Sequence, residues 1–168
     1  MSYKDPTYVI FDGDNDKWAY AFMKGWKAND RIDFDFRDAH DLDNMTGRAQ
    51  DEAYVKANIR ERMKKSKAVL VLVGEKTKNL YKYVRWELEL AIELNLPIIA
   101  VNLNKSNGKD ATLCPAIIRD AGGRAVHIPF TLAAIQFALD NFPSTFATQS
   151  ANDKATASWR YERFDKPL

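Results

Sequence analysis

The chain contains a single cysteine, Cys114, and two histidines, His40 and His127. One cysteine excludes an internal disulfide framework, and these three residues are too few soft ligands for a zinc site. The chain also lacks a large excess of either charge, because 25 basic and 23 acidic residues are mixed along it and leave a formal net charge of +2. A nucleic-acid-binding protein usually carries a basic patch, so we expect no nucleic-acid partner.

Long hydrophobic runs are missing as well. The longest apolar stretches have the length of a strand, and residues 1–6 contain no apolar core of signal-peptide length. We therefore expect a cytoplasmic protein with no membrane partner. A hydrophobic fraction of 46% and a charged fraction of 29% are ordinary for a globular protein, and 168 residues suit one well-cored domain.

What the sequence does have is an alternation of short apolar runs with amphipathic segments. Runs of β-branched and apolar residues bounded by turn residues predict strands, and apolar residues three and four positions apart predict helices. The expected strands are residues 8–11, 32–37, 68–73, 97–103 and 125–130, and the expected helices include residues 17–28, 51–65, 115–120 and 132–141. Alternation of this kind predicts an α/β fold, a flavodoxin-like three-layer sandwich with a five-stranded parallel sheet.

We expect the α/β domain to span residues 1–142 and a C-terminal tail to span residues 143–168. The tail is polar at first and aromatic near its end, where Trp159, Tyr161 and Phe164 occur. Aromatic side chains in a tail favour burial against another surface. We therefore expect the tail to dock on the domain or on a partner.

Phosphate-binding motifs are absent, since neither GxxxxGK[ST] nor GxGxxG follows any expected strand. The acidic loop that holds Asp12 and Asp14 is similar to the pocket of response-regulator receivers, but the third strand ends without the phosphoacceptor aspartate. Asp12, Asp14 and Asp38 offer oxygen ligands for a hard cation, while helix capping and turn formation are the alternative role. We favour helix capping and turn formation and expect no metal ion.

One glutamate stands out in the helix that follows the third expected strand. A glutamate on a helix is usually exposed, and Glu89 and Glu93 are one helical turn apart like a solvated pair. Glu87 differs because it falls near the start of the helix, beside Tyr83 and Trp86, whose aromatic surface can shield a carboxylate or stack on a flat ring. It follows a loop at the carboxyl end of a buried strand, where ligands bind in open α/β sheets.

The region around this helix resembles a known family. An apolar strand at residues 69–73 is followed by the sequence GEKT at residues 74–77, the triplet Arg-Trp-Glu at residues 85–87, and LPII at residues 96–99. This pattern resembles the Toll/interleukin receptor (TIR)-like domains of the Thoeris antiphage family, most closely its B component, and the resemblance extends over roughly residues 7–130. It implies a TIR-like fold and a signalling role in antiviral defence.

TIR enzymes of this type cleave the nicotinamide–ribose bond of NAD with one glutamate in the helix after the third strand, and Glu87 matches that position. The resemblance therefore implies an NAD glycohydrolase or cyclase, with NAD as substrate and no cofactor. It also implies that the loop after the first strand and the long loop at residues 38–48 border the substrate, with Arg48 as a pyrophosphate contact. The residues expected to bind substrate are Phe11, Asp12, Asp14, Asp38, Arg48, Tyr83 and Trp86.

The resemblance also implies partners. Hydrolysis would give ADP-ribose and cyclisation would give a cyclic nucleotide, either of which can act as a signal for a downstream effector. Many TIR enzymes complete their site between two subunits, so we expect self-association. The alternative is a non-catalytic TIR-like signalling or interaction module, in which side chains such as Trp86 would fill the cleft that an enzyme keeps open beside Glu87.

Overall fold

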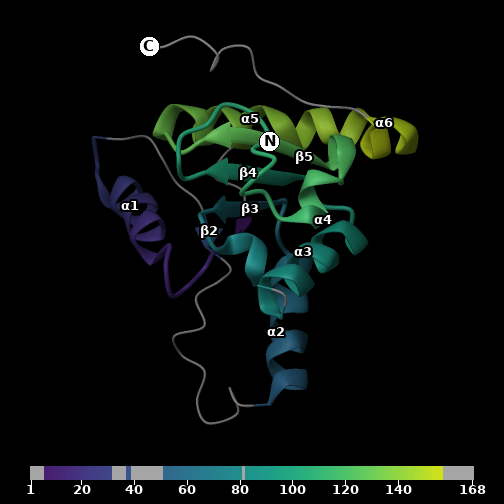
Figure 1. The fold of residues 1–168 in the computed structure, drawn as a ribbon, viewed down its shortest axis with the longest axis horizontal. Coiled ribbons are helices and arrows are strands. Elements are labelled where there is room, and N and C mark those ends of the chain that lie inside the picture. The colour runs from purple at the N-terminus through teal and green to yellow at the C-terminus, as the bar shows by residue number, and fades with distance from the viewer. Residues whose placement is uncertain (1–5, 32–36, 39–50, 81, 157–168) are drawn as a thin grey trace.

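The computed structural model describes residues 6–31, 37–38, 51–80 and 82–156 (Figure 1). Strands and helices alternate along these residues, as expected from the sequence. The elements are β1 (Pro6–Ile10), α1 (Lys17–Ala28), β2 (Arg37–Asp38), α2 (Glu52–Lys64), β3 (Ala68–Val73), the 3₁₀ turn η2 (Thr77–Asn79), α3 (Tyr83–Glu93), β4 (Ile98–Asn102), α4 (Ala116–Arg119), the 3₁₀ turn η3 (Gly122–Arg124), β5 (Ala125–Pro129), α5 (Leu132–Thr148) and α6 (Ala151–Thr156).

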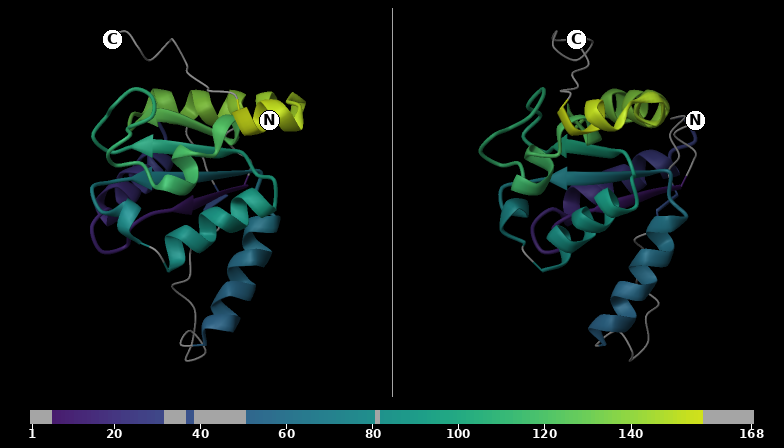
Figure 2. Two further views of the ribbon diagram at one scale, coloured as in Figure 1. Left: turned by 45° about the vertical axis from the view of Figure 1, so that its right-hand side comes forward. Right: turned by 90° about the vertical axis from the view of Figure 1, so that its right-hand side faces the viewer.

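The strands form one sheet of five in the order β2-β1-β3-β4-β5, and every neighbouring pair is parallel. The arrowheads in Figure 2 accordingly point the same way. The parallel α/β fold expected from the sequence is confirmed. The order 2-1-3-4-5 is that of flavodoxin-like sheets, in which the topological switch point lies between β1 and β3. Of the expected second strand, residues 32–36 lie outside the described part of the chain.

Helices cover both faces of this sheet, so its central strands are buried throughout. All residues of β3, β4 and β5 are buried, which explains their continuous apolar sequences. Side chains alternate between the two faces: Leu70 and Leu72 pack with α1 and α5, whereas Val69 and Val71 pack with α2, α3 and α4. Figure 1 shows the same three layers.

Helix α5 extends further than the sequence predicts. The expected end at Asn141 is wrong, because the helix continues through Pro143 to Thr148. Proline lacks a backbone N–H and usually ends a helix. Here Phe142 and Phe146 are 0% and 3% exposed and lie in the core with α1, so burial of their rings offsets the lost hydrogen bond.

The expected boundary between domain and tail, residue 142, therefore falls inside a core helix. Helix α6 follows and lies beside the turn before β5, where a guanidinium nitrogen of Arg124 donates a 3.2 Å hydrogen bond to the carbonyl oxygen of Lys154. Residues 157–168, which carry Trp159, Tyr161 and Phe164, lie outside the described part of the chain.

Candidate functional site

Glu87 lies in the second turn of α3, on the face of the helix that packs against the sheet. Its buried neighbours on α3 include Val84, Leu88 and Ala91, which occupy the spacing of a core-facing stripe. Glu87 is 4% exposed, so a carboxyl group stands where the helix pattern calls for an apolar side chain. The hydroxyl of Tyr8, which is 0% exposed at the middle of β1, donates a 2.7 Å hydrogen bond to Glu87 Oε1.

Burial changes the acidity of this carboxyl group. Loss of hydration raises the pKa of Glu87 from 4.5 to about 7, and the hydrogen bond from Tyr8 offsets part of that rise because it favours the ionised form. At neutral pH the protonated and ionised forms are therefore both populated. A buried carboxyl group with a strongly shifted pKa is a feature that active sites share, since an acid, base or charge stabiliser must be tuned near the working pH.

The neighbouring glutamates behave differently. Glu89 pairs with Arg85 at 2.9 Å and Glu93 pairs with Arg60 at 2.8 Å, and their side chains are 49% and 59% exposed. These are surface ion pairs, which contribute little to stability. The expected distinction between Glu87 and the other two glutamates is therefore visible in their burial.

The loop after β1 is organised around Asp12. Its Oδ1 accepts hydrogen bonds from the backbone N–H groups of Asp14 (2.9 Å) and Asn15 (3.2 Å), and its Oδ2 accepts one from the Asn15 side chain (2.7 Å). Asp12 is 2% exposed, whereas Asp14 is exposed. These bonds form the turn that was the alternative to a metal site. Within the described part of the chain, no group of three or more histidine, cysteine, aspartate or glutamate side chains is arranged to hold a metal ion.

Phe11 lies on the other side of the sheet from Glu87. Its half-buried ring stacks on Tyr20 of α1, with centroids 4.7 Å apart, and packs against the core that α1 and α5 share. Tyr8 faces α2 and α3 instead, because side chains three positions apart on a strand point to opposite faces. The structure therefore does not bring the Phe11 ring to the Glu87 carboxyl group.

Tyr83 and Trp86 lie on α3 near its approach to α2. Tyr83 is 40% exposed, and the Lys82 ammonium lies 5.2 Å from the centre of its ring. Trp86 is half-buried and has the Lys56 ammonium of α2 at 5.2 Å from its ring. Arg48 and the side chain of Asp38 lie outside the described part of the chain.

A junction that the sequence did not predict joins the loops that follow β1 and β3. The backbone N–H of Gly74 donates to Thr77 Oγ1 at 2.9 Å, and the Thr77 hydroxyl donates to Asp16 Oδ2 at 3.3 Å. Asp16 is 5% exposed, and burial raises its pKa. This junction lies at the switch point between β1 and β3, where doubly wound sheets place their ligands.

The contact of Tyr8 with Glu87 was also not predicted from the sequence. The sequence did carry a signal, since a tyrosine on a buried strand needs a hydrogen-bond partner for its hydroxyl. The identity of that partner depends on the packing of α3 against β1, which the sequence pattern does not specify.

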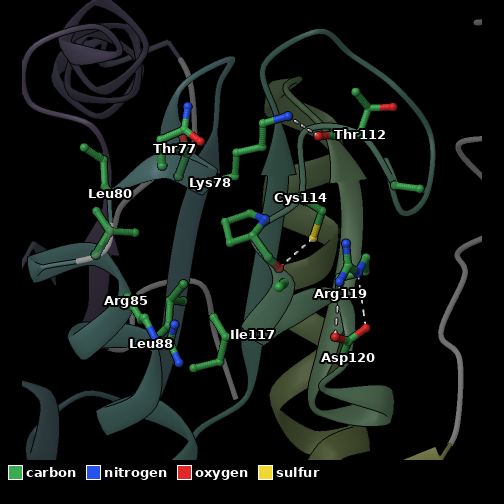
Figure 3. A pocket seen from close by; sticks show the side chains of 15 residues that line it. Thr77, Lys78, Leu80, Arg85, Leu88, Thr112, Cys114, Ile117, Arg119 and Asp120 are labelled. Carbon is green, nitrogen blue, oxygen red and sulfur yellow. Dashed lines mark hydrogen bonds and ion pairs between the residues drawn. The ribbon is translucent and has the colours of Figure 1, made fainter.

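A cavity of about 600 Å³ lies beside α3 (Figure 3). It is lined by residues of η2, α3, α4 and the segment before α4. None of the predicted site residues lines it, so this cavity is not the cleft that a reaction at Glu87 would need.

Comparison with known proteins identifies the family. The model of the TIR-like domain of Thoeris protein ThsB matches residues 3–108, which include β1 to β4 and Glu87. No curated protein matches the chain. Among the described residues, none of the helices is both long and apolar enough to cross a membrane. Since the match spans more than half of the chain, the family expected from the sequence is confirmed, and the protein belongs to the Thoeris ThsB TIR-like domain family.

Proposed function

We propose that this protein is a TIR-like enzyme that cleaves the nicotinamide–ribose bond of NAD, with Glu87 as its catalytic carboxylate. Membership of the ThsB family implies a role in Thoeris antiphage defence. The observation that supports the chemistry best is the buried Glu87 carboxyl group, which is held by Tyr8 and has a pKa raised to about 7. Burying a carboxyl group in a core costs stability, and a purely structural role at this position would not require one.

The reaction needs a negative charge beside the ribose. When the bond between ribose C1′ and nicotinamide breaks, its electron pair goes to the pyridinium nitrogen, so nicotinamide leaves as a neutral molecule and needs no acid. The ribose then carries oxocarbenium character, which a fixed carboxylate stabilises more strongly than water does. Glu87 therefore acts in its ionised form, and Tyr8 keeps that form accessible near neutral pH.

The acceptor decides the product. Attack by water at C1′, with loss of a proton to solvent, gives ADP-ribose. Attack by a nucleophilic atom of the same molecule gives a cyclic product, one water lighter. We propose that this ADP-ribose-derived product is the signal that reaches a downstream effector.

We further propose that NAD binds at the switch point between β1 and β3. The loops after these strands are joined there through Asp16, Gly74 and Thr77. The proposed contacts are those expected from the family resemblance: Phe11, Asp12, Asp14, Asp38, Arg48, Tyr83 and Trp86. The Asp12 oxygens already accept three hydrogen bonds within their loop, so its role would be to shape that loop. Glu87 is only 4% exposed, which favours a site that opens or is completed when the protein self-associates.

Product analysis over a range of protein concentrations tests this proposal. NAD is incubated with protein in water enriched in ¹⁸O, and nicotinamide and nucleotide products are followed by chromatography with mass spectrometry. Hydrolysis incorporates one ¹⁸O into ADP-ribose, whereas cyclisation incorporates none. A specific activity that rises with concentration supports assembly of the site. Absence of nicotinamide release at every concentration, including with protein from phage-challenged cells, would contradict the proposal.

The second candidate is a non-catalytic interaction module. Two observations favour it: the buried Glu87 carboxyl group is hydrogen-bonded to Tyr8, as in a structural contact, and Trp18 and Phe22 of α1 are 49% and 57% exposed. Phage infection of cells that carry Glu87→Gln separates the candidates. The enzyme loses protection with this variant, whereas the module keeps it.

A further inference from the structure

The cavity beside α3 has the dimensions of a ligand pocket. Its volume of about 600 Å³ lies within the range of about 300–1,000 Å³ that small-molecule sites occupy. Figure 3 shows side chains from α3 and η2 on one side and from α4 with its preceding segment on the other. The pocket lies where η2 follows β3 and the 111–115 segment follows β4, at the carboxyl end of the sheet.

The inner wall of this pocket is apolar. It is lined by Leu80, Val84, Leu88, Cys114, Pro115, Ala116 and Ile117. The Cys114 thiol is buried, and burial raises its pKa to about 12, so it stays uncharged and forms part of the apolar wall. An apolar wall of this extent fits a hydrocarbon ring system rather than a sugar or a free ion.

The rim of the pocket is basic. Lys78, Arg85 and Arg119 line it. Arg85 and Arg119 form surface ion pairs with Glu89 and Asp120, whereas the hydrogen-bond partner of the Lys78 ammonium is an uncharged carbonyl oxygen. Figure 3 shows Arg85 and Arg119 on opposite sides of Ile117. The Lys78 ammonium donates a 2.8 Å hydrogen bond to the Thr112 carbonyl oxygen, which holds this cation across the upper end of the pocket. The rim therefore favours an anionic group at the mouth of the pocket.

We propose that this pocket binds a small organic anion: a molecule whose apolar ring system lies on the inner wall and whose sulfonate, phosphate or carboxylate group meets the basic rim. The pocket adjoins the proposed NAD site at Thr77, but Glu87 does not line it. Val84 and Leu88 of α3 face this pocket, whereas Glu87 of the same helix faces Tyr8 on β1. The inference rests on the fold and not on the proposed reaction.

The probe for this site is 8-anilinonaphthalene-1-sulfonate, which combines fused rings with one anionic group and fluoresces when its rings leave water. We expect the folded full-length protein to bind one equivalent. N-phenyl-1-naphthylamine, which has the same rings and no sulfonate, is expected to bind at least about threefold more weakly, because it lacks the charge that the rim recognises. Equal binding of the two probes would overturn the anionic part of the proposal.

Substitutions inside and outside the pocket test whether the probe binds there. Ala116 is exposed on α4 and lines the pocket, so Ala116→Trp fills the pocket without disturbing the core and is expected to abolish probe binding. Lys78→Glu is expected to weaken binding at least about threefold. Lys24→Glu on α1 makes the same charge change outside the pocket, and Phe22→Ser removes an exposed aromatic ring from α1.

Far-UV circular dichroism and thermal melts establish that each variant is folded before its binding is compared. Loss of binding in Ala116→Trp and Lys78→Glu, with wild-type binding in Lys24→Glu and Phe22→Ser, supports the proposed site. Wild-type binding in folded Ala116→Trp, or loss of binding in Phe22→Ser, would overturn it, because the probe would then bind elsewhere.

Discussion

The hydroxyl of Tyr8 on β1 donates a 2.7 Å hydrogen bond to Oε1 of Glu87 on α3, and the two residues are 79 positions apart in the sequence. Both side chains are almost completely buried. The bond joins the sheet to the helix that follows β3. Among the described residues it lowers the pKa of Glu87 and so opposes the rise that burial causes.

Removing the Tyr8 hydroxyl is expected to make Glu87 a weaker acid. In Tyr8→Phe the carboxylate loses a donor that favours its ionised form, so its pKa rises above about 7. The pH at which NAD cleavage reaches half its maximum should then move upward by about one unit, because a buried hydrogen bond to a charged group contributes about 1.5–3 kcal/mol. A pH–rate profile of each protein measures this shift.

Tyr54→Phe is the matched control, since Tyr54 is exposed on α2. Its profile should coincide with that of the wild type. A Tyr8→Phe profile with an unchanged midpoint would show that this bond does not tune the reacting group.

The buried carboxyl group is also expected to make stability depend on pH. The pKa of Glu87 is about 7 in the folded protein, whereas the ordinary value for a glutamate is 4.5, so folding favours the protonated form. Its contribution is complete below pH 4.5 and is lost as pH rises through about 7. Relative to Glu87→Gln, the wild type should lose about 3 kcal/mol of unfolding free energy between pH 4.5 and pH 8. Urea denaturation at the two pH values measures the loss.

Glu89→Gln, which changes an exposed glutamate on the same helix, should show no comparable pH dependence relative to the wild type. A constant difference between wild type and Glu87→Gln across this pH range would contradict the shifted pKa.

The junction at Gly74 should not tolerate a side chain. A Cβ added there would overlap the carboxylate of Asp16, with Cγ at 2.6 Å. Because Asp16 is buried and bonded to Thr77, Gly74→Ala is expected to cost about 1–3 kcal/mol of stability. Gly25→Ala on α1 is the control: nothing lies within 4 Å of its added Cβ, and it should raise stability by about 0.5–1 kcal/mol. Thermal denaturation that ranks the two variants in the opposite order would contradict the described packing.

A chain that ends at residue 142 should be much less stable than one that ends at residue 156. The shorter chain lacks the last turns of α5 and with them Phe146, which is 3% exposed in the core. Loss of one buried phenylalanine costs about 3–5 kcal/mol. Chemical denaturation of both chains measures the difference, and equal stabilities would show that residues 143–156 add nothing to the stability of the domain.

The sequence predicted β1, β3, β4 and β5 and most helices well because each has a strong local pattern. The continuous apolar run of β3 is typical of a buried strand. Asp51 marks the start of α2, where its side chain accepts hydrogen bonds from the backbone N–H groups of Ala53 and Tyr54. The end of α5 was not predictable by the same means. Local propensity stops that helix before Pro143, but tertiary burial of Phe142 and Phe146 carries it on.

The candidate site was predictable only in part. The position of Glu87 in its helix and its aromatic neighbours distinguished it from Glu89, and burial confirms that distinction. Tyr8 and the Asp16–Thr77 contact depend on long-range packing, which periodicity within one element does not specify. The family resemblance implied a substrate contact for Phe11, and that contact stays a prediction; its ring stacks on Tyr20 on the α1 side of the sheet.

The most direct test of the central claim compares nicotinamide release from NAD by wild type, Glu87→Gln and Glu89→Gln at pH 8 and equal, high protein concentration. At this pH most of the Glu87 carboxyl groups are ionised, and glutamine keeps the shape and the acceptor for Tyr8 while removing the charge. We expect release by wild type and Glu89→Gln and a loss of at least about a hundredfold in Glu87→Gln, the scale of one lost electrostatic stabiliser. Release by Glu87→Gln at the wild-type rate would contradict this claim.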